Sequence, residues 1–527
     1  MAARPASWPP CDSAHLLVTS AQMAALEAQL FASGLPVEAL MEKAALAVAA
    51  RLLQGPGGDP LRHRGALVLV GPGHNGGDGL VVARELQLAG LPVRIWSPFE
   101  RRKPLTETHW RHPRWLGIPA LQQPPEPADP ALWIDALFGI GQHRPLDEPL
   151  ADLLNQRQRA QPGGLIALDV PSGLCADSGE PLGGRAACAA LTLCIGLLKQ
   201  GLVQDRALAW VGQLERIDLG LPAALLQALP PKRPRLLGTA DLEQAPRQAP
   251  PPAAGKYERG RLLVVAGSEA YRGAAHLCLQ GASASGCGSI RAALPAAVAE
   301  PLWQLLPHVV VSAALPSGAG GGLGLAALAA ACLERLDAVV LGPGLGPAAP
   351  SPNDGHLWEA LQQLPALLLL DADGLNRLAA RGEAALWLRS RRGPTWLTPH
   401  RGEFNRLFPD LAAAAPLEAA ALAASACGCS LLLKGARTVV AASDGRRWQL
   451  AGANPQAARA GLGDVLAGYA AGRGALAIAA TGSTDAQDLA TAALEHAMAA
   501  DAAVQRLGPG QATPWRVAMA LQTQTPL

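Results

Sequence analysis

A glycine-rich stretch of the chain reads Val70-Gly71-Pro72-Gly73-His74-Asn75-Gly76-Gly77-Asp78-Gly79. The apolar run 66–70 before it predicts a buried strand, and the apolar spacing over 80–86 predicts a helix. Glycines let a backbone approach a phosphate closely, and the start of a helix presents unpaired N–H groups. The stretch therefore predicts an anion site for a nucleotide-like ligand, to which Asn75 and Asp78 add side chains that glycine lacks.

Length and composition indicate two or three domains with ordinary apolar cores. The chain has 527 residues, of which 50% are hydrophobic and only 4% aromatic, so alanine, leucine and valine must fill the cores. Its 44 basic and 42 acidic residues leave a net charge of +2. That balance gives no electrostatic case for binding nucleic acid or an anionic membrane.

The sequence carries no pattern typical of a secreted or membrane protein. Its start lacks a basic segment followed by an apolar run, and its longest uncharged stretch, 301–333, is interrupted by prolines and glycines. The nine cysteines are scattered, and Cys427 and Cys429, the one close pair, lack the partners that a metal site would need. We therefore expect a cytoplasmic protein whose cysteines are small core residues in a reducing compartment.

Proline clusters at 230–234 and 248–252 favour extended linker conformations. They divide the chain into a first domain over 1–235, a linker over 236–255 and a second domain over 256–527. In both domains strand-like runs alternate with helical patterns, which predicts two doubly wound α/β domains with parallel sheets. The strands are expected near 66–70, 93–97, 132–135, 165–170 and 190–195, and then near 262–266, 338–342, 366–371, 395–398, 431–434 and 438–441.

Three expected strands of the first domain end in polar residues within glycine-rich turns. These residues are His74, Asn75, Asp78, Asp135, Asp169 and Ser172. Because parallel strands present their carboxyl ends at one rim, we expect the side chains to converge there. Asparagine, aspartate and serine oxygens suit a hard cation such as potassium, and a further carboxylate suits proton transfer. A lone aspartate at a strand end is more often a helix cap or loop anchor, but three such ends favour a site.

The ordered motifs NGGDG, DALFGIG and LDVPSGL resemble the NAD(P)H-hydrate epimerase family over about residues 15–225, as does the amphipathic opening 19–47. The resemblance implies a Rossmann-like domain in which Asn75, Asp135 and Ser172 hold K⁺ and Asp169 is the catalytic acid/base. It implies that the substrate contacts Asp169 and two loops made by His74, Asn75, Gly76, Gly77, Asp78, Gly139, Ile140, Gly141, Gln142, His143, Arg144 and Pro145. His74 stands where the family usually has asparagine. Its imidazole can still donate or accept a hydrogen bond, so we expect substrate binding to be altered but not abolished.

A second glycine turn, Arg459-Ala460-Gly461-Leu462-Gly463-Asp464, opens an apolar helix in the second domain. The N–H groups at such a helix start can hold a phosphate, and Asp464 can accept a proton from a hydroxyl. Taken alone, the pattern fits an ordinary helix start with a favourable aspartate equally well. Four strand-end motifs favour a site: LGPGLG at 341–346, LDADGLN at 370–376, LTPHRGEF at 397–404 and LLKGART at 432–438.

Together these motifs resemble the ADP-dependent NAD(P)H-hydrate dehydratase family, which has a ribokinase-like fold, over about residues 255–520. The resemblance implies a nucleotide site made by Lys434, Gly435, Ala436, Arg437, Thr438 and Gly463. It places Ala274, Gly344, His400 and Asp464 at the substrate, with Asp464 catalytic, ADP as co-substrate and Mg²⁺ accompanying the nucleotide. A lone histidine such as His400 is more often structural, but its place between Thr-Pro and Gly-Glu favours the site.

The second domain departs from this family at the glycine turn. Gln456, Ala458, Arg459, Ala460 and Leu462 replace several glycine and hydroxyl residues, which weakens the expected phosphate contacts. Arg459 is a candidate cation to compensate for that loss.

A further departure lies after the strand near 395–398. Arg401 stands where the family commonly has proline.

The two resemblances imply one repair pathway for hydrated NADH and NADPH. An isomerase activity would interconvert the R and S 6-hydroxy adducts, and a lyase activity would dehydrate the S epimer to NAD(P)H at the expense of ADP. We expect a homo-oligomer that acts on these small molecules and binds neither nucleic acid nor membrane.

Two alternatives stay open. One is a ribokinase-like small-molecule kinase fused to a non-catalytic binding module. The other is an interaction scaffold that binds RNA through the basic and aromatic residues of 101–115. A solvated helix with buried tryptophans is the simpler interpretation of that segment.

Overall fold

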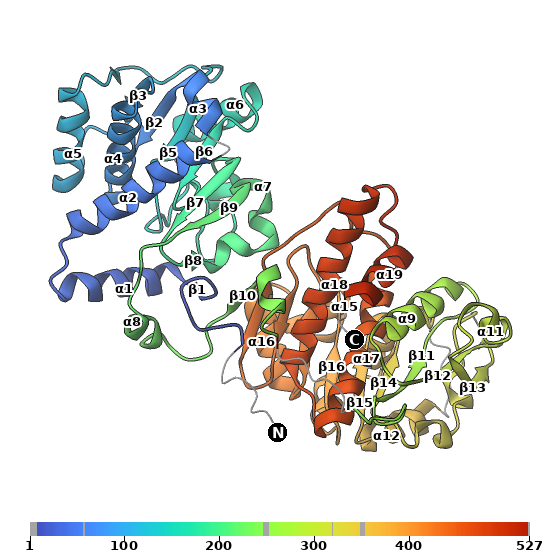
Figure 1. Ribbon diagram of the computed structural model, residues 1–527. Coiled ribbons are helices and arrows are strands. Elements are labelled where there is room, and N and C mark those ends of the chain that lie inside the picture. The colour runs from blue at the N-terminus through green and yellow to red at the C-terminus, as the bar shows by residue number, and fades with distance from the viewer. Residues whose placement is uncertain (1–7, 56–57, 246–251, 319, 348–353, 525–527) are drawn as a thin grey trace. The chain divides into compact units, whose positions relative to one another are not determined.

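The computed structural model describes residues 8–55, 58–245, 252–318, 320–347 and 354–524. The chain forms two compact units, one over residues 10–234 and one that joins residues 8–9 to 235–527 (Figure 1). Each unit is an α/β arrangement on a largely parallel sheet, which confirms the predicted fold class. No helix in these described ranges is long and apolar enough to cross a membrane.

The sheet of the first unit is fully parallel, in the order β4-β3-β2-β5-β6-β7-β9. Its strands are β2 (Ala66–Val70), β3 (Val93–Trp96), β4 (Ala120–Leu121), β5 (Leu132–Ala136), β6 (Leu165–Leu168), β7 (Leu191–Ile195) and β9 (Gln213–Ile217). A separate small sheet pairs β1 (Leu17–Val18) with β8 (Leu198–Lys199). The five predicted strands are present, whereas the edge strand β9 escaped prediction because polar residues occupy three of its five positions.

Helices cover both faces of this sheet, because successive strand residues point to opposite sides. Ala66, Val68 and Val70 pack in one cluster, and Leu67 and Leu69 pack in another. The helices are α1 (Ser20–Ala32), α2 (Val37–Gln54), α3 (Gly58–Arg64), α4 (His74–Leu88), α5 (Pro104–Trp115), α6 (Glu148–Ala160), α7 (Leu208–Val211) and α8 (Ala223–Gln227).

From His74 onward the glycine-rich stretch after β2 belongs to the first turns of α4, and only residues 71–73 form a loop before the helix. A β-carbon on Gly76 would lie 2.1 Å from the Gly71 carbonyl oxygen, and one on Gly79 would lie 2.4 Å from the Ala136 β-carbon. A β-carbon on Gly77 would lie 2.7 Å from the Met41 side chain of α2. These three glycines therefore let α4 pack closely against protein, which is a different reason from the expected approach to a phosphate.

The sheet of the second unit has ten strands in the order β10-β19-β18-β17-β16-β15-β14-β11-β12-β13. They are β10 (Arg235–Leu237), β11 (Arg261–Val265), β12 (Ser289–Pro295), β13 (Val310–Leu315), β14 (Ala338–Leu341), β15 (Leu367–Leu370), β16 (Thr395–Leu397), β17 (Ser430–Leu433), β18 (Val439–Ala441) and β19 (Arg447–Leu450). Only the pairs β17–β18 and β18–β19 among these strands are antiparallel, so the sheet is mixed where a parallel one was expected. The expected linker over 236–255 includes most of β10, which pairs with β19.

Two apolar layers cover this sheet. Leu262 and Val264 face a cluster that includes residues of α9, α17, α18 and α19, and Leu263 and Val265 face a cluster built with α13 to α16. The helices are α9 (Arg272–Ala284), α10 (Ala296–Ala299), α11 (Leu302–Leu305), α12 (Asp354–Gln363), α13 (Ala372–Ala380), α14 (Ala384–Arg389), α15 (Arg401–Leu407), α16 (Pro416–Cys427), α17 (Leu462–Thr481), α18 (Ala486–Leu507) and α19 (Pro514–Gln524).

Trp8 anchors the start of the described chain in the core of the second unit. The side chain is 3% exposed, and its Nε1 donates a hydrogen bond of 3.0 Å to the Asp241 carbonyl oxygen. The Trp8 carbonyl oxygen accepts from Trp448 Nε1 at 3.1 Å, and Pro9 O accepts from Arg235 Nη1 at 2.6 Å. Residues 8–9 thus complete this unit, although they precede their hydrogen-bond partners by 226 residues or more in the sequence.

We expect Trp8→Ala to lower the free energy of unfolding of the second unit by about 3–5 kcal/mol, because it removes a buried indole and leaves a cavity. Urea unfolding of the full chain would measure the change. Trp303, 68% exposed in the same unit, offers a matched Trp→Ala control with an effect within about 0.5 kcal/mol. Equal losses in the two variants would contradict an anchoring role for Trp8.

Two candidate active sites

Polar side chains from β2, β5 and β6 meet at one rim of the first sheet, as the parallel arrangement predicts. Asn75, in the first turn of α4 after β2, donates from Nδ2 to the Leu168 carbonyl oxygen of β6 at 3.4 Å. A β-carbon on Gly139, after β5, would lie 3.5 Å from the Asn75 β-carbon and 3.2 Å from Asp169 Oδ2. Asn75, Gly139 and Asp169 are therefore neighbours.

Asp135 and Ser172 form a buried oxygen-rich cluster beside them. The Ser172 hydroxyl donates to Asp135 Oδ1 at 2.7 Å, and the Ser172 backbone N–H donates to Oδ2 at 2.8 Å. Asp135 is fully buried, and burial raises its pKa, although the hydrogen bonds from Ser172 and Leu137 oppose that rise. No ion pair compensates this carboxylate among the described residues, so the buried oxygens of Asp135 and Ser172 fit a bound monovalent cation.

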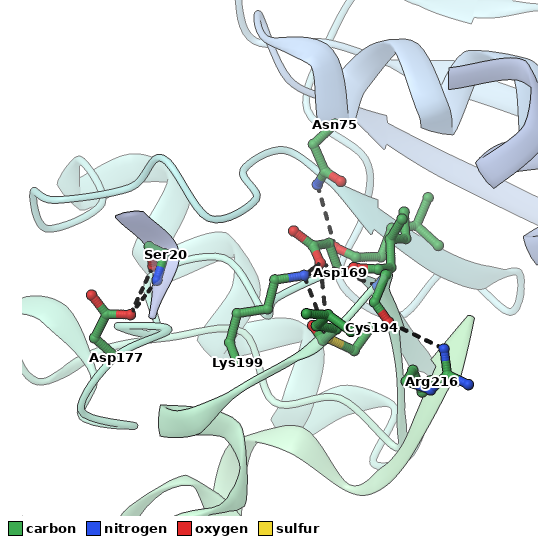
Figure 2. A network of polar contacts seen from close by, with 11 residues as sticks. Ser20, Asn75, Asp169, Asp177, Cys194, Lys199 and Arg216 are labelled. Carbon is green, nitrogen blue, oxygen red and sulfur yellow. Dashed lines mark hydrogen bonds and ion pairs between the residues drawn. The ribbon is translucent and has the colours of Figure 1, made fainter. Parts of the chain in front are cut away.

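Asp169 has an unusual backbone conformation, with φ at +65°, in the turn that follows β6. Such a left-handed conformation is strained for a residue other than glycine. Its Oδ1 accepts from Lys199 Nζ at 2.5 Å and from the Ile195 backbone N–H at 3.2 Å (Figure 2). The buried Lys199 was not predicted from the sequence. The signal available was a lone lysine directly after the apolar segment 194–198.

Two further carboxyls lie near Asp169. Burial raises the pKa of Asp78 well above its usual range, and the charges of Asp169 and Glu27 add to that rise. Burial, followed by the charge of Asp169, raises the pKa of Glu27 on α1. The rim thus combines a carboxylate paired with an ammonium and two carboxyls whose pKa values are raised, which is an arrangement suited to proton transfer.

The loop 139–145 lies against the turn that carries Ser172. Gln142 donates from Nε2 to Pro171 O at 3.1 Å and accepts from the Gly173 N–H at 2.6 Å. Its amide therefore links the two loops by two hydrogen bonds. Ile140 packs against the apolar cluster of α1. Gly141, His143, Arg144 and Pro145 are exposed.

His74 is exposed at the start of α4. Partial burial lowers the pKa of its imidazole, and the nearby Lys103 lowers it further. The ring is therefore neutral near neutral pH and offers one donor and one acceptor.

A second rim forms at the carboxyl ends of β14 to β17 in the second unit. The Lys434 ammonium after β17 is paired with the buried Asp371 carboxylate after β15. A β-carbon on Gly463, in the first turn of α17, would lie 3.2 Å from Lys434 Nζ. Burial and the charge of Asp371 raise the pKa of Asp464 to about 7, against the opposing charge of Lys434. Asp464 is therefore poised as a proton acceptor near neutral pH.

His400 lies on this rim and caps α15. Its Nδ1 accepts from the Gly402 backbone N–H at 2.9 Å, and its Nε2 lies 3.1 Å from Glu403 Oε1. These contacts assign the proton to Nε2. Lys434 N–H donates to Pro399 O at 2.9 Å, which brings the ends of β16 and β17 together. His400 thus has the structural role that lone histidines often have, while its side chain stays 55% exposed at the rim.

The remaining predicted residues lie in neighbouring loops. Gly344 follows β14 with φ at +62°, and a β-carbon there would lie 2.6 Å from the Ala274 β-carbon at the start of α9. The turn between β17 and β18 is made by Lys434, Gly435, Ala436, Arg437 and Thr438. Gln449 Nε2 donates to Arg437 O at 2.8 Å and braces this turn.

Both arginines that depart from the family pattern have protein partners. Arg459 donates to Pro509 O and to Gly510 O, and its role as a cation that compensates for the lost phosphate contacts stays a prediction. Arg401 Nη2 donates to Ala412 O at 2.6 Å and to Ala414 O at 2.8 Å. It therefore ties α15 to the segment that follows it.

In the basic and aromatic segment 101–115, Arg102 and Trp110 contact the rest of the protein, whereas Arg101, Lys103, Arg111 and Arg114 are exposed. Arg102 lies 3.9 Å from the Trp110 ring centroid and forms an ion pair of 3.2 Å with Glu107. Trp110 packs against the core, but Trp115 is 79% exposed, so the expectation of two buried tryptophans is wrong for Trp115.

Comparison with known proteins finds two family models in this chain. The model for the N-terminal part of YjeF-related proteins matches residues 37–201, and the model for NAD(P)H-hydrate dehydratase matches residues 262–522. An ADP/ATP-dependent NAD(P)H-hydrate dehydratase of known structure from Bacillus subtilis is 25% identical, with a TM-score of 0.43, over 54% of this chain and 95% of that one.

Two curated relatives match both units. A bifunctional NAD(P)H-hydrate repair enzyme from Synechocystis is 43% identical over 93% of this chain and 91% of its own length. Another, from Gloeobacter violaceus, is 44% identical over 86% of this chain and 87% of its own length. With such identity across nearly the whole length of both proteins, the chain belongs to the family of bifunctional NAD(P)H-hydrate repair enzymes.

Proposed function

We propose that this chain repairs hydrated NADH and NADPH with two active sites. The first unit interconverts the R and S 6-hydroxy adducts, and the second dehydrates the S epimer with ADP. The observation that carries this proposal is the 43% identity to the Synechocystis repair enzyme, which spans both units. The two rims, each with a buried carboxylate that pairs with a lysine, support it chemically.

The second unit makes a poor leaving group into a good one. The adduct carries a hydroxyl on C6, beside the ring nitrogen, and hydroxide leaves poorly. Asp464 takes the hydroxyl proton while the oxygen attacks the terminal phosphoryl group of ADP and AMP departs. The C6–O bond then breaks with help from the nitrogen lone pair, phosphate leaves, and loss of a ring proton gives NAD(P)H.

ADP binds beside Lys434 to Thr438 and Gly463, and the N–H groups at the start of α17 stabilise phosphoryl charge. No group of three or more His, Cys, Asp or Glu side chains forms a metal site within the described ranges. Mg²⁺ would accompany the nucleotide and bind its phosphates, as is usual for this ion. Ala274, Gly344 and His400 border the hydrated ring.

The first unit inverts C6 through proton transfer at Asp169. The start of α4 at His74 and the loop that begins at Gly139 border Asp169 and hold the substrate. Asn75, Asp135 and Ser172 would hold K⁺, whose charge would offset that of Asp135 and stabilise negative charge that develops on the substrate. The buried carboxylate of Asp135, which has no ion-pair partner in the part of the chain that the structure describes, supports this assignment.

Potassium should stabilise the first unit through Asp135. Burial raises the pKa of Asp135, so its ionised form costs folding free energy at neutral pH, and a bound cation offsets that cost. We expect KCl to raise the Tm of the wild type more than choline chloride at equal ionic strength, and Asp135→Asn to abolish the difference. Asp152→Asn, an exposed carboxylate of the same unit, should keep the difference. An unchanged KCl response in Asp135→Asn would exclude this cation site.

A ribokinase-like kinase fused to a binding module makes a different prediction. Such an enzyme would consume nucleotide with sugars or other small alcohols. The repair enzyme should consume ADP only when hydrated NADH or NADPH is supplied, which phosphate release would measure.

The expected homo-oligomer stays a prediction. Light scattering on the purified chain would test it.

A further inference from the structure

Lys199 is almost completely buried at the centre of the first rim, and its side chain is 1% exposed. It belongs to the short strand β8, which pairs with β1, and it follows the end of β7 by four residues. Its Nζ donates to Asp169 Oδ1 at 2.5 Å and to the Ile195 carbonyl oxygen at 2.7 Å, and it lies 3.6 Å from Cys194 Sγ (Figure 2). The ammonium is thus fixed by partners at the end of β7 and by Asp169.

The charge on Lys199 persists because of its acidic neighbours. Burial alone would lower the pKa of this ammonium, but the charge of Asp169, with smaller contributions from Cys194 and Glu27, raises it above the ordinary value. The charged and titratable groups around the Lys199–Asp169 pair are Glu27 on α1, Asp78 on α4 and Cys194 on β7. A buried carboxylate at this place needs a cation, since an unpaired buried charge is strongly disfavoured.

The two oxygens of Asp169 have different surroundings. Oδ1 accepts from Lys199 and from the Ile195 N–H. Oδ2 lies towards Gly139, where a β-carbon would be 3.2 Å away, and Figure 2 shows Asn75 on the side of Asp169 away from Cys194. In the described part of the chain no side chain or N–H donates to Oδ2, so this oxygen is left for a ligand at the loop 139–145.

We propose that Lys199 is a positioning residue for the epimerisation step: by donating to Oδ1 it holds the Asp169 carboxylate so that Oδ2 exchanges the proton with the substrate. The inference rests on the proposed epimerase function and names a residue that acts through Asp169. The ammonium favours the charged form of the carboxylate. Loss of the ammonium should therefore shift the acidic limb of the pH–rate profile to higher pH.

The test measures conversion of purified R epimer to S epimer by the full chain. ADP is left out so that dehydration does not consume the S epimer. For Lys199→Met we expect kcat/KM at neutral pH to fall about 100-fold. We also expect the acidic limb of its pH–rate profile to shift by about 1–3 pH units to higher pH. Lys199→Gln keeps a hydrogen-bond donor without the charge and should show the same shift. Lys199→Arg keeps the charge and should leave the limb within about half a pH unit of wild type.

Lys43→Met, at an exposed lysine on α2, is the matched control and should behave as wild type. Thermal unfolding of each variant, and its dehydration of S epimer with ADP, check that the chain is folded. A lower rate with an unmoved acidic limb in Lys199→Met and Lys199→Gln would overturn the proposal, since it would show a merely structural role. If the wild type itself inverts no R epimer, the proposed epimerase function fails instead.

Discussion

Replacing Asp464 with asparagine should lower the ADP-dependent dehydration of the S epimer by about 10²–10⁴-fold, because it removes the base that accepts the hydroxyl proton. The isosteric amide keeps the shape of the first turn of α17 and its packing beside Lys434 and Asp371. Release of phosphate and recovery of reduced-cofactor absorbance would both measure the loss. Asp410→Asn, at an exposed position of the same unit, is the control and should retain full activity.

The pH dependence of this step tests the same residue independently. Burial and the neighbouring charge of Asp371 raise the pKa of Asp464 to about 7. Since the base must be deprotonated to act, kcat/KM for the S epimer should rise with pH and reach half its maximum near pH 7. A profile that stays flat from about pH 5.5 to 8.5 would contradict the role of Asp464 as a base.

Asp169→Asn should separate the two activities. We expect inversion of the R epimer to fall by about 10²–10⁴-fold, because the amide cannot exchange a proton as the carboxylate does. Dehydration of the S epimer should continue at the wild-type rate, since that chemistry belongs to the other unit. In a mixed pool the variant with ADP should therefore consume the S epimer and stall, apart from slow spontaneous inversion of the remainder.

Chromatography of the two epimers over time would show this stall. The control Asp152→Asn should exhaust both epimers. If Asp169→Asn also exhausts both at the wild-type rate, Asp169 is not the acid/base of the epimerase.

Most of the fold could be predicted because the central strands are continuous apolar runs. Strands such as β2 and β15 are buried on both faces and consist of alanine, valine and leucine. The strands that escaped prediction lack this signal. β13 lies at an edge of its sheet, with Val310 and Val311 exposed, and β12 is rich in alanine, which favours no strand.

The candidate sites were predictable where a side chain follows a strand in a glycine-rich motif, as for Asp135, Asp169 and Asp464. Lys199 was not, because its partner Asp169 lies 30 residues away and only the packed sheet brings the two together. The hydrogen-bond partners of some polar side chains could not be predicted from the sequence either. The ring of His400 caps α15, and Arg459 binds backbone carbonyls near residue 510.

The decisive experiment is repair of a mixed-epimer preparation of hydrated NADH by the intact chain with ADP. We expect full recovery of reduced-cofactor absorbance, with one AMP and one phosphate formed for each NADH restored. If the intact chain with ADP or ATP regenerates no NADH from either epimer, the proposed repair function is wrong.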